Sequence, residues 1–225
     1  MGRKCSPLIL RIGFIKKWQS TWFANKKDFS NYIQEDLKIR NYIKSKFSQA
    51  AIARIMIDRL ANQLRVRIAS ARPGIIIGRH GADIDRLRED LKGITERELA
   101  IDIEEIKNPA VEAQLVAENI AYQLVKRIAF RRAIKRAIEQ TMTAGAKGIK
   151  VVCSGRLGGA EMSRQESYKQ GKLPLSTFRA DIDYGFAEAQ TTYGKIGVKT
   201  WIYKGDVILE KKRQPLAAPL SEKKE

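Results

Sequence analysis

Residues 71–81 have the sequence Ala71-Arg72-Pro73-Gly74-Ile75-Ile76-Ile77-Gly78-Arg79-His80-Gly81. The last four residues form a Gly-x-x-Gly loop with two basic side chains, and a helix is expected directly after it. Glycine lets another backbone approach without a Cβ in the way. A helix N-terminus adds free N–H groups and a partial positive charge. The loop is therefore a candidate site for nucleic-acid phosphates, although a Gly-x-x-Gly by itself is also typical of an ordinary turn.

The residues around this loop follow strand and helix patterns in turn. Residues 51–57 are mostly apolar and predict a buried strand, and residues 64–68 alternate strictly between apolar residues and arginine. Apolar residues recur with helical spacing over 82–92, and residues 99–104 alternate as a third strand. The order helix, strand, strand, glycine loop, helix, strand is that of a KH domain, whose loop clamps about four nucleotides of a single strand.

The second half of the chain predicts helices followed by strands. A helical region is expected over 110–144 with a break near Ile128, and a hairpin turn is expected at 191–195. Four strands are expected at about 149–153, 160–169, 179–190 and 196–202. The predicted class is α+β, with two helices on a four-stranded, mainly antiparallel sheet in this half. Residues after about 209 are polar and Pro-rich and predict a disordered tail.

Composition and charge favour a nucleic-acid-binding protein over a membrane protein. The 225 residues include 43 Lys and Arg against 25 Asp and Glu, which gives a formal net charge of +18. Such an excess points to a polyanionic partner, and nucleic acid is favoured over an anionic membrane surface. No apolar run approaches the roughly 20 residues that span a bilayer, so a cytoplasmic protein without membrane contact is expected.

The rare residues argue against an enzyme. His80 is the only histidine, so a multi-histidine metal site is excluded and a catalytic triad would have to use this residue. Cys5 and Cys153 are far apart and are expected to be free thiols. The sequence has no P-loop motif. The acidic residues of 83–90 interleave with arginines, as on a solvated helix face rather than at the metal site of a nuclease. No catalytic residue, metal, cofactor or small-molecule substrate is predicted.

A second candidate site lies in the predicted helical region. Basic side chains fall on one helical face, and apolar residues fall on the opposite face. Between Lys126 and Arg136 the sequence holds no acidic residue, so these like charges repel one another and a polyanion would relieve the repulsion. A solvated charged face is the alternative. The basic residues of this face are Arg131, Arg132, Lys135 and Arg136.

The N-terminal region is basic and aromatic. Residues 1–50 contain 11 Lys and Arg against three acidic residues, and Trp18, Trp22 and Phe23 lie among lysines. Cations can pair with phosphates and aromatic rings can stack on bases, which suits RNA. The rings could equally pin this region to a protein surface, so both interpretations stay open. Farther along the chain, residues 154–161 are either a phosphate-binding nest or a connection between strands.

Several blocks of the sequence together resemble one known family. Residues 71–81 look like the core of a type II KH domain, which has a three-stranded sheet with helices on one face. Residues 152–161, 179–184 and 191–199 resemble the C-terminal domain of the third protein of the bacterial small ribosomal subunit. Residues 17–24 match the N-terminal region of the same family. The resemblance runs in the correct order over nearly the whole chain.

This resemblance implies a structural component of the ribosome. Members of the family bind small-subunit ribosomal RNA in the head of the subunit, contact the tenth and fourteenth small-subunit proteins, and line the channel through which mRNA enters. Carried onto this chain, Arg131, Arg132 and Lys135 would face mRNA and help to open its structure without hydrolysing a nucleotide. The alternative is a free-standing KH protein that acts as an RNA chaperone or regulator. It would share the loop but has no evident need of the second domain.

The resulting prediction divides the chain into four parts. These are a basic aromatic arm (1–38), a type II KH domain (39–107), a C-terminal α+β domain (108–209) and a disordered tail (210–225). The family usually carries lysines where this chain has Arg79 and His80. Besides the loop Gly78, Arg79, His80 and Gly81 and the basic helix, the candidate RNA contacts are Arg3, Lys4, Arg11, Lys17, Arg72, Lys147, Arg156 and Arg164.

Overall fold

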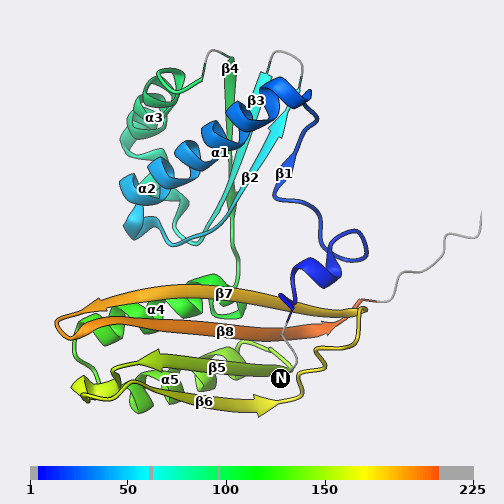
Figure 1. The fold of residues 1–225 in the computed structure, drawn as a ribbon. Coiled ribbons are helices and arrows are strands. Elements are labelled where there is room, and N and C mark those ends of the chain that lie inside the picture. The colour runs from blue at the N-terminus through cyan, green and yellow to red at the C-terminus, as the bar shows by residue number, and fades with distance from the viewer. Residues whose placement is uncertain (1–4, 61–62, 96, 208–225) are drawn as a thin grey trace, which may run out of the picture.

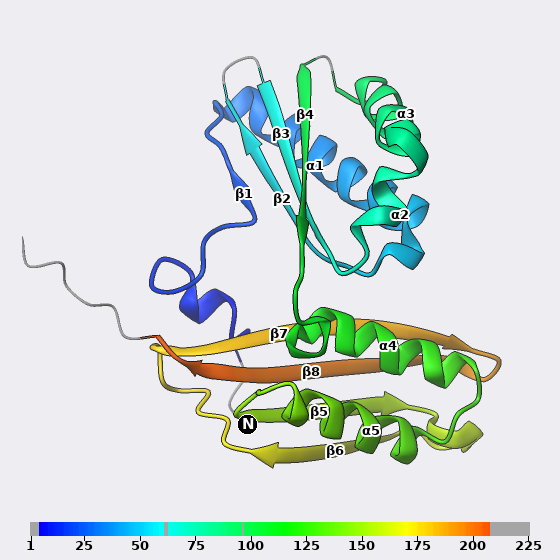
Figure 2. The same ribbon diagram turned by 180° about the vertical axis from the view of Figure 1, so that it is seen from behind.

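The computed structural model describes residues 5–60, 63–95 and 97–207, and these form two α+β domains (Figures 1 and 2). Each domain has its own sheet and its own core of buried apolar side chains. No helix within these ranges is long and apolar enough to cross a membrane. The predicted tail, 210–225, lies outside the described residues.

The first domain places helices on one face of a four-stranded sheet (Figures 1 and 2). The three predicted strands are confirmed, and β2 pairs antiparallel with β3 while β3 pairs parallel with β4. Leu64, Val66 and Ile68 are fully buried, as their alternation predicts, and pack with residues of the helices. The elements are β2 (Ile52–Arg59), β3 (Gln63–Ser70), β4 (Glu98–Glu105), α1 (Lys26–Lys46), α2 (Pro73–Ile77) and α3 (Ala82–Lys92).

A fourth strand in this sheet was not predicted. β1 comprises only Ser20–Thr21 and pairs parallel with β2, so the sheet has the order β1-β2-β3-β4 rather than three strands. The predicted boundary between an arm and the first domain, at 38/39, falls inside α1. Residues 26–38 therefore belong to a helix of the first domain, because Ile39 and Ile43 of the same helix are buried in its core.

The second domain has two helices on one face of a four-stranded antiparallel sheet, as predicted (Figure 2). The order of the strands in this sheet is β6-β5-β8-β7. The helical region is broken at 126–129, where Arg127 has a φ of +60°. The elements are α4 (Ala113–Val125), α5 (Phe130–Thr143), β5 (Gly148–Gly155), β6 (Arg164–Gly171), β7 (Ala180–Thr191) and β8 (Gly194–Asp206). Short 3-10 turns occupy Ile9–Arg11, Ser48–Ala50, Arg79–Gly81, Pro109–Val111 and Leu157–Gly159.

The N-terminal segment, residues 5–25, runs from the second domain to the edge of the first sheet (Figure 1). Arg11 is fully buried, and its guanidinium donates hydrogen bonds to the carbonyl oxygens of Pro7, Leu175, Thr177 and Ala180 at 2.6–3.0 Å. Lys16 pairs with Asp181 at 2.8 Å. The expectation that Arg11 contacts RNA is therefore wrong, because its donors serve carbonyl groups inside the protein.

Replacing Arg11 by methionine should loosen this segment. The substitution keeps an apolar stem but leaves four buried or half-buried carbonyl oxygens without their donor, which should cost about 1–3 kcal/mol of unfolding free energy. Denaturant unfolding measures the loss, and faster amide exchange at residues 11–16 locates it. The exposed Lys17→Met is the matched control and should change little. Equal stability of the two variants would show that the Arg11 contacts contribute nothing.

Candidate nucleic-acid interface

The glycine loop lies between α2 and α3 and depends on its glycines. Gly78 and Gly81 have φ angles of +71° and +82°, in the region that favours glycine. A Cβ on Gly78 would overlap the carboxylate of Asp83, because the first turn of α3 lies directly against this residue. Arg79 and His80 are exposed, and His80 also has a positive φ of +54°. The loop thus presents two basic side chains and the N-terminus of α3 to solvent.

The basic face of α5 consists of Arg131, Arg132, Lys135 and Arg136, and all four are exposed. The opposite face of the helix is apolar and buried, and Ile134, Ala137 and Ile138 lie in the core of the second domain. Burial of the apolar face fixes the direction of the basic face. The predicted division of this helix into two faces is therefore confirmed.

The start of the basic face is in contact with strand β6. Arg131 Nη2 donates a hydrogen bond to Glu166 Oε1 at 3.4 Å, and Arg164 Nε forms an ion pair with the same oxygen at 3.3 Å. The contact with Glu166 raises the pKa of Arg131. The structure thus brings Arg131 and Arg164 together, a contact between α5 and β6 that was not predicted from sequence. The glycine loop belongs to the other domain and is a separate surface.

The remaining candidate residues differ in their exposure to solvent and in their hydrogen bonds within the protein. Lys17, Arg72, Lys147 and Arg164 are exposed and can reach a partner. Arg156 instead donates to the carbonyl oxygens of Ala160 and Tyr193, at 2.9 and 3.3 Å, so much of its guanidinium holds the 156–160 loop. Arg3 and Lys4 lie outside the described residues.

The aromatic residues of the N-terminal segment were predicted either to stack on RNA or to attach the segment to a protein surface, and the structure has residues of both kinds. Trp22 donates from Nε1 to Asp36 at 2.9 Å and is therefore held to α1. Trp18 and Phe23 are 65% and 91% exposed, so their rings are available to a partner. Trp22 supports attachment to a protein surface, whereas Trp18 and Phe23 remain candidates for stacking on RNA.

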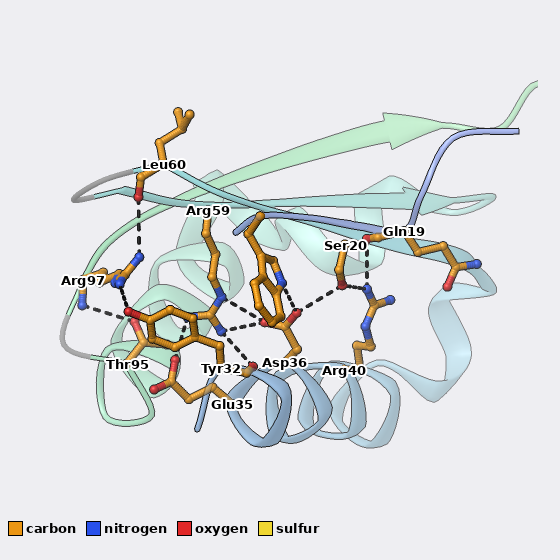
Figure 3. A network of polar contacts seen from close by, with 11 residues as sticks. Gln19, Ser20, Tyr32, Glu35, Asp36, Arg40, Arg59, Leu60, Thr95 and Arg97 are labelled. Atoms are coloured by element: carbon orange, nitrogen blue, oxygen red, sulfur yellow. Dashed lines mark hydrogen bonds and ion pairs between the residues drawn. The ribbon is translucent and has the colours of Figure 1, made fainter. Parts of the chain in front are cut away.

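A polar network that the sequence did not reveal joins β1, α1 and β2 (Figure 3). Arg59 is buried and contacts Asp36 at 2.6 Å and Glu35 at 2.7 Å. Asp36 also accepts a hydrogen bond from Ser20 at 3.1 Å, and Arg40 donates to the Gln19 carbonyl at 3.0 Å. Burial alone would lower the pKa of Arg59, but its hydrogen bonds to the two carboxylates raise it. This network attaches the short strand β1 to the first domain.

Three observations on the described residues bear on metal-dependent and nucleophilic chemistry. These residues contain no group of three or more His, Cys, Asp or Glu placed to hold a metal ion. Asp83 and Asp85 pair with Arg86 and Arg88 at 3.9 and 3.2 Å, as on a salt-bridged helix face. Burial raises the pKa of the Cys153 thiol to about 12, which makes it a poor nucleophile.

Comparison with known proteins assigns both domains. Residues 38–111 match the KH domain family, and residues 120–202 match the family of the ribosomal protein S3 C-terminal domain. The small ribosomal subunit protein uS3 of Desulforamulus reducens is 58% identical over 213 residues, which cover 95% of this chain and 96% of the relative. The uS3 protein of Carboxydothermus hydrogenoformans is 56% identical over 217 residues, which cover 96% and 98%. The chain belongs to the uS3 family.

Membership in the uS3 family gives the chain a structural, RNA-binding role in the small ribosomal subunit, and the ribosome is its place of action. It is not an enzyme. The match extends over both domains and the N-terminal segment, so it favours the ribosomal assignment over a free-standing KH regulator. The prediction of a type II KH domain followed by a second α+β domain is confirmed.

Proposed function

We propose that this uS3 family member binds small-subunit ribosomal RNA in the head of the subunit and lines the channel that receives mRNA. In this proposal the basic face of α5 helps to open structured mRNA during translation. The observation that carries it is the row of four exposed cations on α5, held outward by a fully buried opposite face. Contacts with the tenth and fourteenth small-subunit proteins are part of the same proposal.

The chemistry of the basic face suits a passive melting edge. Single strands have a flexible backbone, and fixed cations along a helix can follow it, whereas a rigid A-form duplex presents a different spacing. Thermal motion opens terminal base pairs, and cations that hold the freed strand oppose their closing. Translocation supplies the direction, so no nucleotide hydrolysis by this chain is needed.

Alanine at Arg131, Arg132 and Lys135 should slow translation of structured messages selectively. Reconstituted ribosomes carrying the triple variant should slow on a message with a stable hairpin and run nearly normally on an unstructured message. In the free chain, loss of three phosphate contacts should flatten the dependence of log affinity for single-stranded RNA on log salt by about 2. Translation rates on the two messages and binding over a salt series are the measurements.

The matched control replaces Lys26, Lys27 and Lys44 by alanine. These three exposed lysines lie on α1, so the control removes the same charge from the other domain. It should leave the ratio of translation rates on the two messages unchanged. Equal slowing of the triple α5 variant on both messages would mean that the basic face serves assembly or general RNA binding, and the melting role would be abandoned.

A further inference from the structure

Strand β6 lies at one edge of the second sheet and carries a single carboxylate among basic residues. Arg164, Glu166 and Tyr168 are two residues apart, so they share one face of the strand. Tyr168 packs against the core of the second domain, and Arg131 of α5 reaches Glu166 on the same face. Glu166 thus lies beside the start of the basic face.

Glu166 contacts every polar side chain of this group. Its Oε1 atom lies 3.4 Å from Arg131 Nη2 and 3.3 Å from Arg164 Nε, and its Oε2 atom accepts a hydrogen bond from the Tyr168 hydroxyl at 3.0 Å. Both guanidinium groups also lie against the ring of Phe130, at 5.5 and 5.8 Å from its centroid. One carboxylate and one ring therefore hold two arginines from different elements.

The two arginines keep donors for a partner despite these contacts. The Arg131 and Arg164 side chains are 65% and 51% exposed, whereas the Glu166 side chain is 21% exposed. Burial alone would raise the pKa of Glu166, but hydrogen bonds from Arg131 and Tyr168 and the charges of both arginines lower it. The carboxylate therefore stays charged at neutral pH. On charge alone, an anion at this place weakens attraction for RNA.

We propose that Glu166 is a positioning residue that holds Arg131 and Arg164 as a fixed pair, and that this pair extends the phosphate-binding surface from α5 onto β6. The inference rests on the proposed function of the basic face. A guanidinium already held in place loses less side-chain freedom when it binds a phosphate. Two held guanidinium groups can also contact neighbouring phosphates of one strand without rearrangement. The Glu166 carboxylate thus lowers the positive charge of this surface by one unit, but it orders the guanidinium groups of Arg131 and Arg164.

Glu166→Gln separates positioning from attraction by charge. The variant makes the surface more basic, so an account based on charge alone predicts equal or better translation of a hairpin message. Positioning predicts the reverse, with the ratio of hairpin to unstructured translation rates falling by about twofold, as for loss of an exposed ion pair. Glu166→Asp keeps the charge on a shorter side chain and should restore part of the ratio.

The matched control is Glu188→Gln at the opposite edge of the same sheet. Glu188 is exposed on β7 and pairs with Lys195 at 3.0 Å, so the control makes the same change of charge away from α5. It should leave the ratio unchanged. In the free chain, NMR order parameters of the Arg131 and Arg164 Nε–H groups should fall in Glu166→Gln and not in Glu188→Gln.

The outcomes distinguish this inference from the proposed function. A normal or increased ratio in Glu166→Gln, while the triple α5 alanine variant is slow on hairpins alone, overturns positioning and leaves the role of the basic face intact. Equal slowing of Glu166→Gln on both messages assigns Glu166 to folding or assembly and also overturns positioning. Equal slowing of the triple α5 variant on both messages removes the proposed function and the inference with it.

Discussion

Replacing Arg79 and His80 together by aspartate should weaken binding of single-stranded RNA by the first domain by about 100-fold, as expected for two lost charge-assisted contacts. The two side chains are exposed, and aspartate tolerates the positive φ of His80, so the fold should survive. The measurement is RNA affinity at fixed salt in a chain that already carries alanine at Arg131, Arg132 and Lys135. This background reduces the contribution of the basic face.

The control for this experiment is aspartate at Arg86 and Arg88. These residues lie on α3, beyond the glycine loop, and pair with Asp83 and Asp85. The control introduces the same two aspartates and removes the charges of two arginines. It should weaken binding much less if the loop itself clamps the strand. Equal losses would mean that the domain attracts RNA only by its overall charge, and the clamp would be rejected.

The long elements of the fold could be predicted because their signals are local. Alternation in residues 64–68 and helical spacing in 82–92 report burial directly, and β3 and α3 lie at those places. β1 had no such signal, since two residues carry no period. Its position is set by contacts with Asp36 and Arg40, which lie on α1, the helix that follows β1 in the sequence.

The candidate site was predictable to the same degree. The basic face of α5 follows from helical periodicity, and the loop from its glycines. Glu166 did not stand out, because it is 35 residues from Arg131 and meets it only when β6 pairs with β5. Arg11 gave a misleading signal: a cation in a basic segment suggests RNA, but carbonyl groups of residues 175–180 surround it. The charge of a side chain follows from the sequence, whereas the group that this side chain contacts depends on the tertiary fold.

The Asp36 network also depends on the tertiary fold, and breaking it should strongly destabilise the first domain. Asp36 is 5% exposed and accepts hydrogen bonds from Ser20, Trp22 and Arg59, while the Arg59 side chain is 2% exposed (Figure 3). The desolvation of two charges is offset only while their contacts are complete. Removal of one member leaves a buried charge with fewer partners.

Asp36→Ala should therefore lower the free energy of unfolding by about 3–5 kcal/mol, the usual cost of breaking a buried ion pair. Asp102→Ala is the control: Asp102 pairs with Arg65 at 2.6 Å on the surface of the same sheet, and its loss should cost about 0–1 kcal/mol. Denaturant unfolding measures both. The Ile57 amide, which donates to the Gln19 carbonyl at 2.9 Å, should exchange faster in Asp36→Ala because β1 is released.

The double variant Asp36→Ala with Arg59→Met tests the physical reason. If an uncompensated buried charge causes the loss, removing Arg59 as well should make the double variant less destabilised than the sum of the two single variants. Additive losses would show that the two side chains contribute independently through packing. Unchanged exchange at Ile57 in Asp36→Ala would show that β1 is held by its backbone pairing alone. Either of these two results would show that the ion pair does not attach the N-terminal segment. Non-additive losses of stability together with faster exchange at Ile57 would instead make Asp36 the residue that joins this segment to the first domain.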